Sequence, residues 1–329
     1  MSEMSYLEAI WSAIAEEMRT DPRVFVMGQD IDLFLAGGAL AREFGSQRVR
    51  CTPISEAGFI GAGIGAALTG MRPIVELGSS TFLYSAMDQV VNQAAKNRYM
   101  FGGQAKVPLV IRAPVLYGCS SAAHHSDRPW GLFAQAPGLK IVVATTPYEV
   151  KGLLKSAIRD DNPVLCFEDL SLWGRRGVVP EHDYTIALGV ADIKRHGSDV
   201  TIVALAAAVH HSLMAAQELD KQGISVEVID VRTVVPLDRH TIFESVSKTG
   251  RLLVVDPAPG MCGVAAEVAA SVAENVWESL RAPIVRLTAP DVPVPFSPHL
   301  EPLLYPTAEK IAAAVSRQLD WRPSAARRA

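Results

Sequence analysis

Two short segments of the sequence combine side chains that can do chemistry. In the first, Thr52–Phe59, one carboxylate, Glu56, stands between apolar residues just before a glycine-rich apolar run. A buried carboxyl group there would have a raised pKa, which suits a group that holds or shares a proton. The alternative is a carboxylate at a helix N-terminus that accepts hydrogen bonds from backbone N–H groups. The sequence alone leaves both interpretations open.

The second segment, Ala122–Arg128, is a polar cluster that contains His124 and His125 in a loop of small residues. It follows an apolar run at 109–111 that reads as a strand, and loops after the carboxyl ends of parallel strands commonly carry the chemistry of α/β proteins. Histidine titrates near neutral pH and can serve as an acid or a base. A metal site is disfavoured, because no other His or Cys stands nearby at ligand spacing.

Other kinds of chemistry lack their motifs. Gly61–Ala66 matches a loose dinucleotide fingerprint, but no strand leads into it and no suitably placed acidic residue follows, so it indicates a buried, closely packed helix. The sequence has no P-loop, G-x-S-x-G or H-E-x-x-H motif. With 31 Lys and Arg against 35 Asp and Glu, the net charge of −4 gives no general attraction to nucleic acid or to an anionic membrane.

Cysteine spacing and the N-terminus indicate a cytoplasmic protein. The four cysteines stand far apart without a C-x-x-C pair, which argues against a zinc site and against a disulfide framework. The N-terminus lacks the basic-then-apolar layout of a signal peptide. The most apolar stretch, 58–71, is too short to span a bilayer as a helix.

Alternating strands and helices must position these residues. Ser5 and Glu8 form the pattern of a capping box and open a helix, and Thr146–Ile158 is predicted as a helix with Pro147 at its first position. Apolar runs predict buried strands at 24–27, 109–111, 141–144 and 164–167. Strands that alternate with helices in this way predict a parallel sheet.

A second domain follows a connection at about 175–188. Strands are predicted at 200–205, 225–229, 252–255 and 284–287, and helices near 209–222, 238–248, 263–279 and 307–319. We therefore predict an α/β fold of two doubly wound domains, 1–188 and 189–321, followed by a disordered tail, 322–329.

The order of motifs resembles the E1 β subunits of the pyruvate, branched-chain 2-oxo acid and acetoin dehydrogenases. This family is similar to the pyrimidine-binding and C-terminal domains of transketolase, and the resemblance extends from Leu7 to about Leu319. The stretches that carry it are Thr52–Phe59, Met87–Lys96, His124–Ser126, Pro137–Lys140, Ala157–Asp160, Glu227–Thr233 and Pro236–Asp238. So many matches in the same order exclude a chance similarity.

The resemblance implies a thiamine-diphosphate enzyme and assigns roles to both segments. Glu56 falls on the glutamate that hydrogen-bonds the aminopyrimidine ring and thereby helps to remove the C2 proton of the cofactor. Phe82, Gln29 and Ser85 fall on positions beside the cofactor. His125 falls on the histidine that serves as acid or base when the acyl group of a decarboxylated 2-oxo acid passes to a lipoyl carrier.

The resemblance also implies partners and metal ions. In the family, Mg²⁺ anchors the diphosphate on a G-D-G motif, and these 329 residues contain none. An α-type subunit must then bind Mg²⁺ in an α2β2 heterotetramer, which a lipoylated E2 acyltransferase can join. A structural potassium ion is expected at backbone carbonyls that match Leu109, Ala157, Ile158, Asp160 and Asn162.

The candidate substrate pocket departs from the family pattern. His124 precedes His125, the usual H-S-Q ends in Asp127 and is followed by Arg128, and Gln135 replaces a histidine. Arg128 is either a partner for an anionic substrate or a solvated loop residue.

These changes motivate a second hypothesis, a thiamine-dependent acyloin or acyl-transfer enzyme of specialised metabolism without a lipoyl partner. A third hypothesis is a catalytically silent scaffold for the α subunit, against which the presence of Glu56 and His125 counts.

Overall fold

The computed structural model describes residues 1–31, 38–116 and 118–322, which form two compact units. The first consists of Met1–Gly189 with Arg232–Pro236 and Val294–Pro298, and the second contains the remaining described residues from Val190 onward. Because the units interleave in sequence, a linear domain boundary after residue 188 stays a prediction. The predicted tail lies outside the described residues, apart from Arg322.

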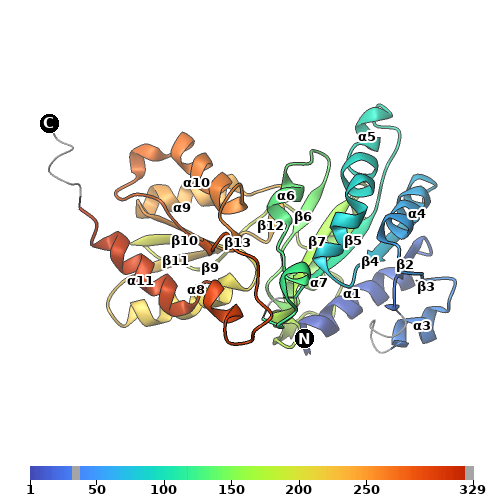
Figure 1. Ribbon diagram of the computed structural model, residues 1–329, viewed down its shortest axis with the longest axis horizontal. Helices are drawn as coiled ribbons and strands as arrows, with labels where there is room; N and C mark the ends of the chain where they lie inside the picture. The colour runs from blue at the N-terminus through green and yellow to red at the C-terminus, as the bar shows by residue number, and fades with distance from the viewer. Residues whose placement is uncertain (32–37, 117, 323–329) are drawn as a thin grey trace. The chain divides into compact units, whose positions relative to one another are not determined.

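A seven-stranded sheet in the order β12-β6-β7-β5-β4-β2-β3 is the centre of the first unit (Figure 1). Its neighbouring strands are parallel, except that β12 runs antiparallel to β6. The strands are β2 (Val24–Gly28), β3 (Val49–Cys51), β4 (Arg72–Glu76), β5 (Val110–Val115), β6 (Lys140–Val142), β7 (Val164–Asp169) and β12 (Thr233–Val235). The predicted α/β class is thus confirmed.

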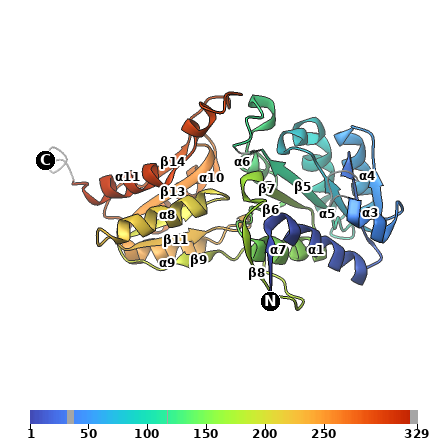
Figure 2. The same ribbon diagram turned by 90° about the horizontal axis from the view of Figure 1, so that it is seen from below.

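Helices cover both faces of this sheet. The predicted capping box opens α1 (Tyr6–Thr20), where the Ser5 hydroxyl accepts from the backbone N–H of Glu8 and the Glu8 carboxylate accepts from that of Ser5. The predicted α7 (Pro147–Arg159) has Thr146 as its N-cap. Figures 1 and 2 show α1 and α7 side by side on one face of the sheet and α4 (Glu56–Leu68) on the other.

The glycines of α4 allow close packing, as the sequence indicated. A Cβ atom on Gly63 would lie 2.9 Å from the Val75 side chain, and one on Gly61 would lie 3.0 Å from the side-chain oxygen of Gln89. Gly61 lies inside the helix and not in a strand-to-helix turn, so the dinucleotide fingerprint is a coincidence of small residues.

Several short strands escaped prediction. β1 (Ser2–Ser5) pairs antiparallel with β8 (Arg176–Val179), in a segment expected to be an irregular connection. Both strands are four residues long and only Val179 among their residues is buried, so they lack the apolar run of a buried strand. β4 lies inside the sheet, but it was not predicted. Pro73 and the charged end residues Arg72 and Glu76 leave only two apolar residues in sequence, too few to indicate a strand.

The second unit contains a five-stranded sheet in the order β14-β13-β10-β11-β9, parallel except for β9 at its edge. As predicted, helices alternate with its strands, and Figures 1 and 2 show α8 and α11 on one face and α9 and α10 on the other. The elements are β9 (Asp192–Arg195), β10 (Val200–Ala204), α8 (Ala208–Asp220), β11 (Val226–Asp230), α9 (Arg239–Thr249), β13 (Leu252–Pro259), α10 (Val264–Asn275), β14 (Val285–Ala289) and α11 (Ala308–Leu319).

Shorter helical turns complete the chain. They are α3 (Ala39–Phe44), η2 (Ser80–Ala86), η3 (Gln89–Ala94), α5 (Asn97–Met100), η4 (Ala123–His125), α6 (Trp130–Ala134), η5 (Leu170–Leu172), η6 (Trp277–Ser279) and η7 (Glu301–Leu304). Among the described residues, no helix has both the length and the apolar character needed to cross a membrane.

Candidate functional site

The predicted chemical residues follow four adjacent strands of the first sheet. In the order β5-β4-β2-β3, these strands lead into the His125 loop, into η2, to Gln29 and to Glu56, respectively. The four strands are parallel to one another, so their carboxyl ends meet at one edge of the sheet. The topology therefore gathers residues that lie almost a hundred positions apart in the sequence.

Glu56 is the first residue of α4 and is half-buried. The hydroxyl of Ser85 lies 3.1 Å from Glu56 Oε2 and 2.9 Å from the backbone oxygen of Phe82. A serine hydroxyl has one hydrogen to donate, so these two acceptors compete for it. Ser85 thus links the carboxylate to the turn that carries Phe82.

His125 lies against Phe82. Their rings are 5.6 Å apart in an edge-to-face arrangement, and the ring of the exposed His124 is 4.2 Å from that of His125. His125 Nδ1 lies 3.3 Å from the backbone oxygen of Ser121. A hydrogen on Nδ1 would be donated to that oxygen, which leaves Nε2 as the nitrogen available for proton transfer.

The backbone around the site has unusual conformations. Asp30, Ser120 and Ala122 have φ of 52°, 52° and 63°, in the left-handed region that non-glycine residues rarely adopt. Such conformations cluster at functional sites and persist only where surrounding contacts hold them. Two of them lie directly before His125, and one follows Gln29.

The remaining predicted pocket residues differ in exposure. Asp127 is exposed, and its carboxylate accepts a hydrogen bond of 2.9 Å from the Tyr84 hydroxyl. Arg128 is buried, with 5% of its surface exposed, and its Nη1 donates to the Ser126 backbone oxygen at 3.2 Å. It is therefore not the solvated loop residue of the alternative interpretation. Gln135 is exposed directly after α6.

The surroundings of Gln29 indicate whether an aminopyrimidine ring fits this site. Its Oε1 is buried and has no hydrogen-bond partner within the part of the chain that the structure describes. A Cβ atom on Gly78 would lie 3.4 Å from both Gln29 Nε2 and the Phe82 ring, so the absence of a side chain there leaves these groups adjacent. An orphaned acceptor, an aromatic ring and the Glu56 carboxylate suit a flat ring that carries hydrogen-bond donors.

Two of the carbonyls expected to bind potassium converge. The backbone oxygens of Ile158 and Asp160 accept hydrogen bonds of 3.0 and 2.9 Å from one atom, Nη1 of Arg72. Two of the other three expected carbonyls are engaged within the fold, since Leu109 accepts from Val164 at 2.9 Å and Ala157 from Asp160 at 3.3 Å. Two carbonyl oxygens that point at one positive group fit a cation-binding position. In this structure the Arg72 guanidinium occupies that position for Ile158 and Asp160.

The sequence reasoning missed a buried charge cluster on β4, β5 and β7. Arg112 donates from Nε and Nη2 to the two carboxylate oxygens of Glu168, both at 2.6 Å, and from Nη1 to Glu76. Burial raises the pKa of Glu76 to about 7, although Arg112 opposes the shift. The sequence did contain a signal for this cluster. Arg112 stands among apolar residues of β5, and a buried charge requires a partner of opposite charge.

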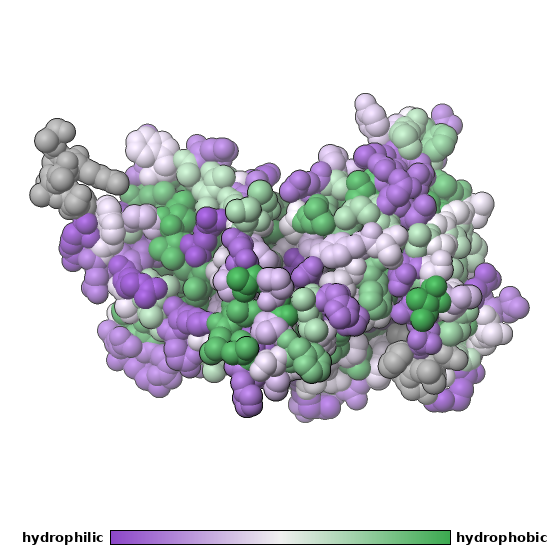
Figure 3. Space-filling model, in the orientation of Figure 1, coloured by the Kyte–Doolittle hydropathy of each residue, from purple (hydrophilic) through white to green (hydrophobic). Residues whose placement is uncertain are grey.

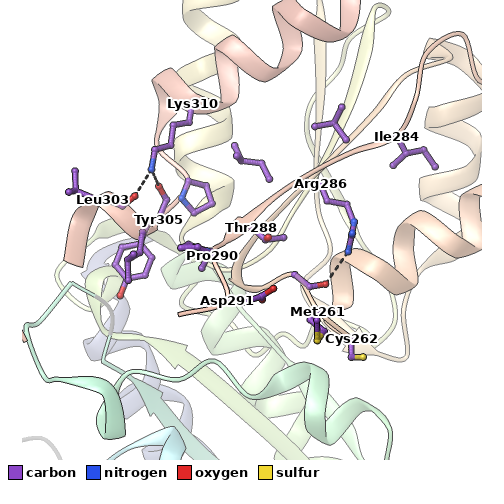
Figure 4. Close-up of a pocket in the computed structure, with 16 residues that line it drawn as sticks. Met261, Cys262, Ile284, Arg286, Thr288, Pro290, Asp291, Leu303, Tyr305 and Lys310 are labelled. Carbon is purple, nitrogen blue, oxygen red and sulfur yellow. Dashed lines mark hydrogen bonds between the residues drawn. The ribbon is translucent and has the colours of Figure 1, made fainter. Parts of the chain in front are cut away.

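A hollow lies within the second unit. It has a volume of about 990 Å³ and is lined by Met261, Arg286, Asp291 and Lys310 among others. Arg286 donates to the Gly260 backbone oxygen at 3.0 Å, and Lys310 donates to that of Leu303 at 2.7 Å (Figure 4). These cations serve the fold, and the lining of the hollow contains the Asp291 carboxylate but no histidine.

Both halves of the chain match known domain families. Residues 2–173 match the transketolase pyrimidine-binding domain, and residues 189–311 match the transketolase C-terminal domain. A split-gene transketolase structure, described as an inactive β4 tetramer, is similar with a TM-score of 0.81 over 97% of this chain and 99% of that chain. Since its sequence identity is 23%, that likeness shows the fold alone.

Curated relatives span nearly the whole chain. The β subunit of acetoin:2,6-dichlorophenolindophenol oxidoreductase from Bacillus subtilis is 46% identical over 98% of this chain and 98% of its own length. From the same organism, the β subunit of 2-oxoisovalerate dehydrogenase is 44% identical and the pyruvate dehydrogenase E1 β subunit is 43% identical, each over 98% of this chain and 100% of its own length.

Proposed function

This chain belongs to the E1 β-subunit family of the thiamine-diphosphate-dependent 2-oxo acid and acetoin dehydrogenases, and on that premise we propose that it supplies half of an active site. The observation that carries the proposal is the meeting of Glu56, Phe82 and the orphaned Gln29 Oε1 after adjacent parallel strands. The chain has no G-D-G motif, so the other half, with Mg²⁺, belongs to an α-type subunit.

In the proposed reaction, a 2-oxo acid is decarboxylated and its acyl group passes to a lipoyl carrier. Thiamine diphosphate, when bound, supplies the electron sink for this chemistry. Glu56 shares a proton with the aminopyrimidine ring, and Gln29 Oε1 accepts a hydrogen bond from it. His125 donates or takes a proton during acyl transfer, through Nε2.

An α2β2 assembly agrees with the surface of the chain. On the face drawn in Figure 3, apolar side chains gather in patches among polar ones. At the end of the helical segment that includes α5, Tyr99, Met100 and Phe101 are 90%, 59% and 56% exposed. Contiguous exposed apolar side chains commonly mark surfaces that another protein covers.

The acetoin-specific relatives favour a second candidate, oxidation of an acyloin. Two of the similar chains, from Bacillus subtilis and Cupriavidus necator, are β subunits of acetoin oxidoreductases at 46% identity. Asp127, Arg128 and Gln135 depart from the usual pattern around the same site. Under this candidate, Glu56 keeps its role and the substrate pocket accepts a neutral hydroxyketone.

The test is to co-express the chain with each α-type subunit that its genome encodes and to add thiamine diphosphate and Mg²⁺. A panel of 2-oxo acids and acetoin is then assayed with an artificial electron acceptor and with a lipoylated carrier domain. Turnover of a 2-oxo acid with both acceptors supports the dehydrogenase, and turnover of acetoin alone supports the second candidate. Assembly without turnover of any substrate would leave only a scaffold role.

A further inference from the structure

One short turn contacts both candidate catalytic residues. Within η2 and its N-cap, Ser85 contacts the Glu56 carboxylate and Phe82 contacts the His125 ring. The same turn hydrogen-bonds the backbone of the His125 loop, since the Ser79 hydroxyl donates to the His125 oxygen at 3.3 Å. Ser79 and Ser80 are almost fully buried, so η2 is a fixed base for both residues.

The His125 loop requires such support. Ser120 and Ala122 hold left-handed conformations that cost roughly 1–3 kcal/mol each outside a constraining environment. Within the loop, the Ser126 hydroxyl donates to the Ala122 oxygen at 2.7 Å, and His125 Nδ1 lies 3.3 Å from the Ser121 oxygen. Contacts from η2 add to these bonds and attach the loop to the rest of the unit.

Asp127 receives two such contacts from η2. Its backbone oxygen accepts from the Ser80 hydroxyl at 2.8 Å, and its carboxylate accepts from the Tyr84 hydroxyl at 2.9 Å. Partial burial and the neighbouring Asp127 both raise the pKa of Tyr84, which keeps the phenol a hydrogen-bond donor near neutral pH. Tyr84 and Asp127 thus form a side-chain pair that spans η2 and the loop.

We propose that Tyr84 and Asp127 are a positioning pair that fixes the His125 loop on η2, at a set distance from Glu56. The inference rests on the proposed function, because it assumes that His125 acts in acyl transfer. In this role Asp127 must accept a hydrogen bond, but it does not need a negative charge. It acts through the position of His125 and not by contact with a reacting atom.

The charge and the hydrogen bond are separable by substitution. Asp127→Asn keeps a carbonyl oxygen that accepts from Tyr84, whereas Asp127→Ala and Tyr84→Phe each remove one partner. We expect acyl transfer to lipoyl to fall about fivefold in Tyr84→Phe and Asp127→Ala, the loss of one net hydrogen bond, and to fall less in Asp127→Asn than in Asp127→Ala. The double variant Tyr84→Phe with Asp127→Ala should be no worse than either single variant.

Tyr184→Phe is the matched control. It removes another phenolic hydroxyl in the same unit, which donates to the Tyr148 backbone oxygen at 2.8 Å. All variants are measured in the assembled α-containing complex with two assays, decarboxylation with an artificial acceptor and acyl transfer to lipoyl. Hydrogen exchange of peptides that cover 120–128 should become faster in Tyr84→Phe and stay unchanged in Tyr184→Phe.

His125→Ala separates failure of this inference from failure of the proposed function. If His125→Ala leaves acyl transfer intact, the proposed role of His125 is wrong. If His125→Ala lowers acyl transfer while Tyr84→Phe leaves both acyl transfer and loop exchange unchanged, the positioning pair is refuted. A loss in Asp127→Asn as large as in Asp127→Ala would show that the charge matters, which also refutes the pair as proposed.

Discussion

Among the described residues, Glu56 has no basic side chain as a hydrogen-bond partner, which suits the proposed sharing of a proton with the cofactor ring. Its hydrogen-bond partner in the described structure is the neutral hydroxyl of Ser85, which also faces the Phe82 oxygen. A guanidinium partner would favour the ionised form of a carboxylate, because an opposite charge lowers its pKa. The chain contrasts the two situations, since Arg112 holds Glu168 with two hydrogen bonds in the same unit.

Glu56→Gln should abolish exchange of the cofactor C2 proton and preserve assembly with the α subunit. Glutamine has the same shape, but its amide cannot share a proton with the aminopyrimidine ring. The measurement is proton–deuterium exchange of bound thiamine diphosphate, followed by NMR after acid quench. Ser85→Ala is the control, because it removes a contact of Glu56 without removing the carboxylate, and it should slow exchange only a few-fold.

Exchange at a near-normal rate in assembled Glu56→Gln would contradict the role given to this carboxylate. The catalytic site would then lie elsewhere in the complex.

His125→Ala should slow acyl transfer more than decarboxylation. The ring lies beside Phe82 and its Nδ1 faces the Ser121 backbone oxygen, so Nε2 is the nitrogen proposed to face the acyl acceptor. Single-turnover assays of the two half-reactions measure the difference, and a general acid or base typically contributes about 100-fold or more. Equal losses in both half-reactions would rule out a specific role in transfer.

Motifs in the sequence predicted the candidate residues, but not the contacts among them. Glu56 and His125 stand in stretches whose residue types indicate chemistry, and the structure brings both to η2. The pairs Ser85–Glu56 and Tyr84–Asp127 span 29 and 43 positions, and no local pattern specifies which residues of two loops will meet. These pairs follow from the strand order β5-β4-β2-β3, which required β3 and β4, neither of which was predicted.

At the level of elements, the sequence predicted those strands that are buried on both faces of the sheet. Long apolar runs such as Val164–Phe167 in β7 were recognised, because parallel strands covered by helices on both sides are apolar throughout. β1 and β8 are edge elements with exposed residues, and β4 begins and ends with charged residues. The charge at the end of β4 belongs to Glu76, whose partner on β5 cannot be recognised from sequence.

Glu76→Gln should change how stability depends on pH. Burial raises the folded-state pKa of Glu76 from 4.5 to about 7, so the folded state favours the protonated form. That contribution is fully present below about pH 4.5 and is lost as the pH rises through about 7. The neutral amide of the variant avoids this loss, so its melting temperature relative to wild type should rise between pH 5 and pH 8.

Differential scanning fluorimetry across that pH range measures the effect. Glu181→Gln, at an exposed carboxylate that pairs with the N-terminus, is the control and should show no such trend. A pH-independent difference between Glu76→Gln and wild type would mean that Arg112 keeps Glu76 ionised in the folded state.

The end of α7 provides a test of the potassium proposal. If the carbonyls of Ile158 and Asp160 bind the ion in addition to Arg72, then potassium should stabilise the folded chain by mass action. The melting temperature in KCl should exceed that in choline chloride at equal ionic strength, by a margin that grows with KCl concentration. Equal values in the two salts would indicate that the Arg72 guanidinium alone satisfies these carbonyls.

At the scale of the whole molecule, the sequence has no G-D-G motif for a diphosphate. In the proposed function, Glu56, Phe82 and Gln29 contact only the aminopyrimidine ring of the cofactor. A diphosphate held by Mg²⁺ supplies much of the affinity for such a cofactor, and its carboxylate and amide ligands are expected on another chain. Affinity should therefore arise only when the two chains meet.

Isolated chain should bind thiamine diphosphate with Mg²⁺ too weakly to detect by titration calorimetry, and the complex with its α-type subunit should bind it stoichiometrically. Size-exclusion chromatography with light scattering would give the mass of an α2β2 heterotetramer for the mixture. Glu56→Gln should assemble equally well, because Glu56 faces the ring and not the diphosphate. Tight, Mg²⁺-dependent binding by the isolated chain would place the diphosphate anchor within these 329 residues and refute the shared active site.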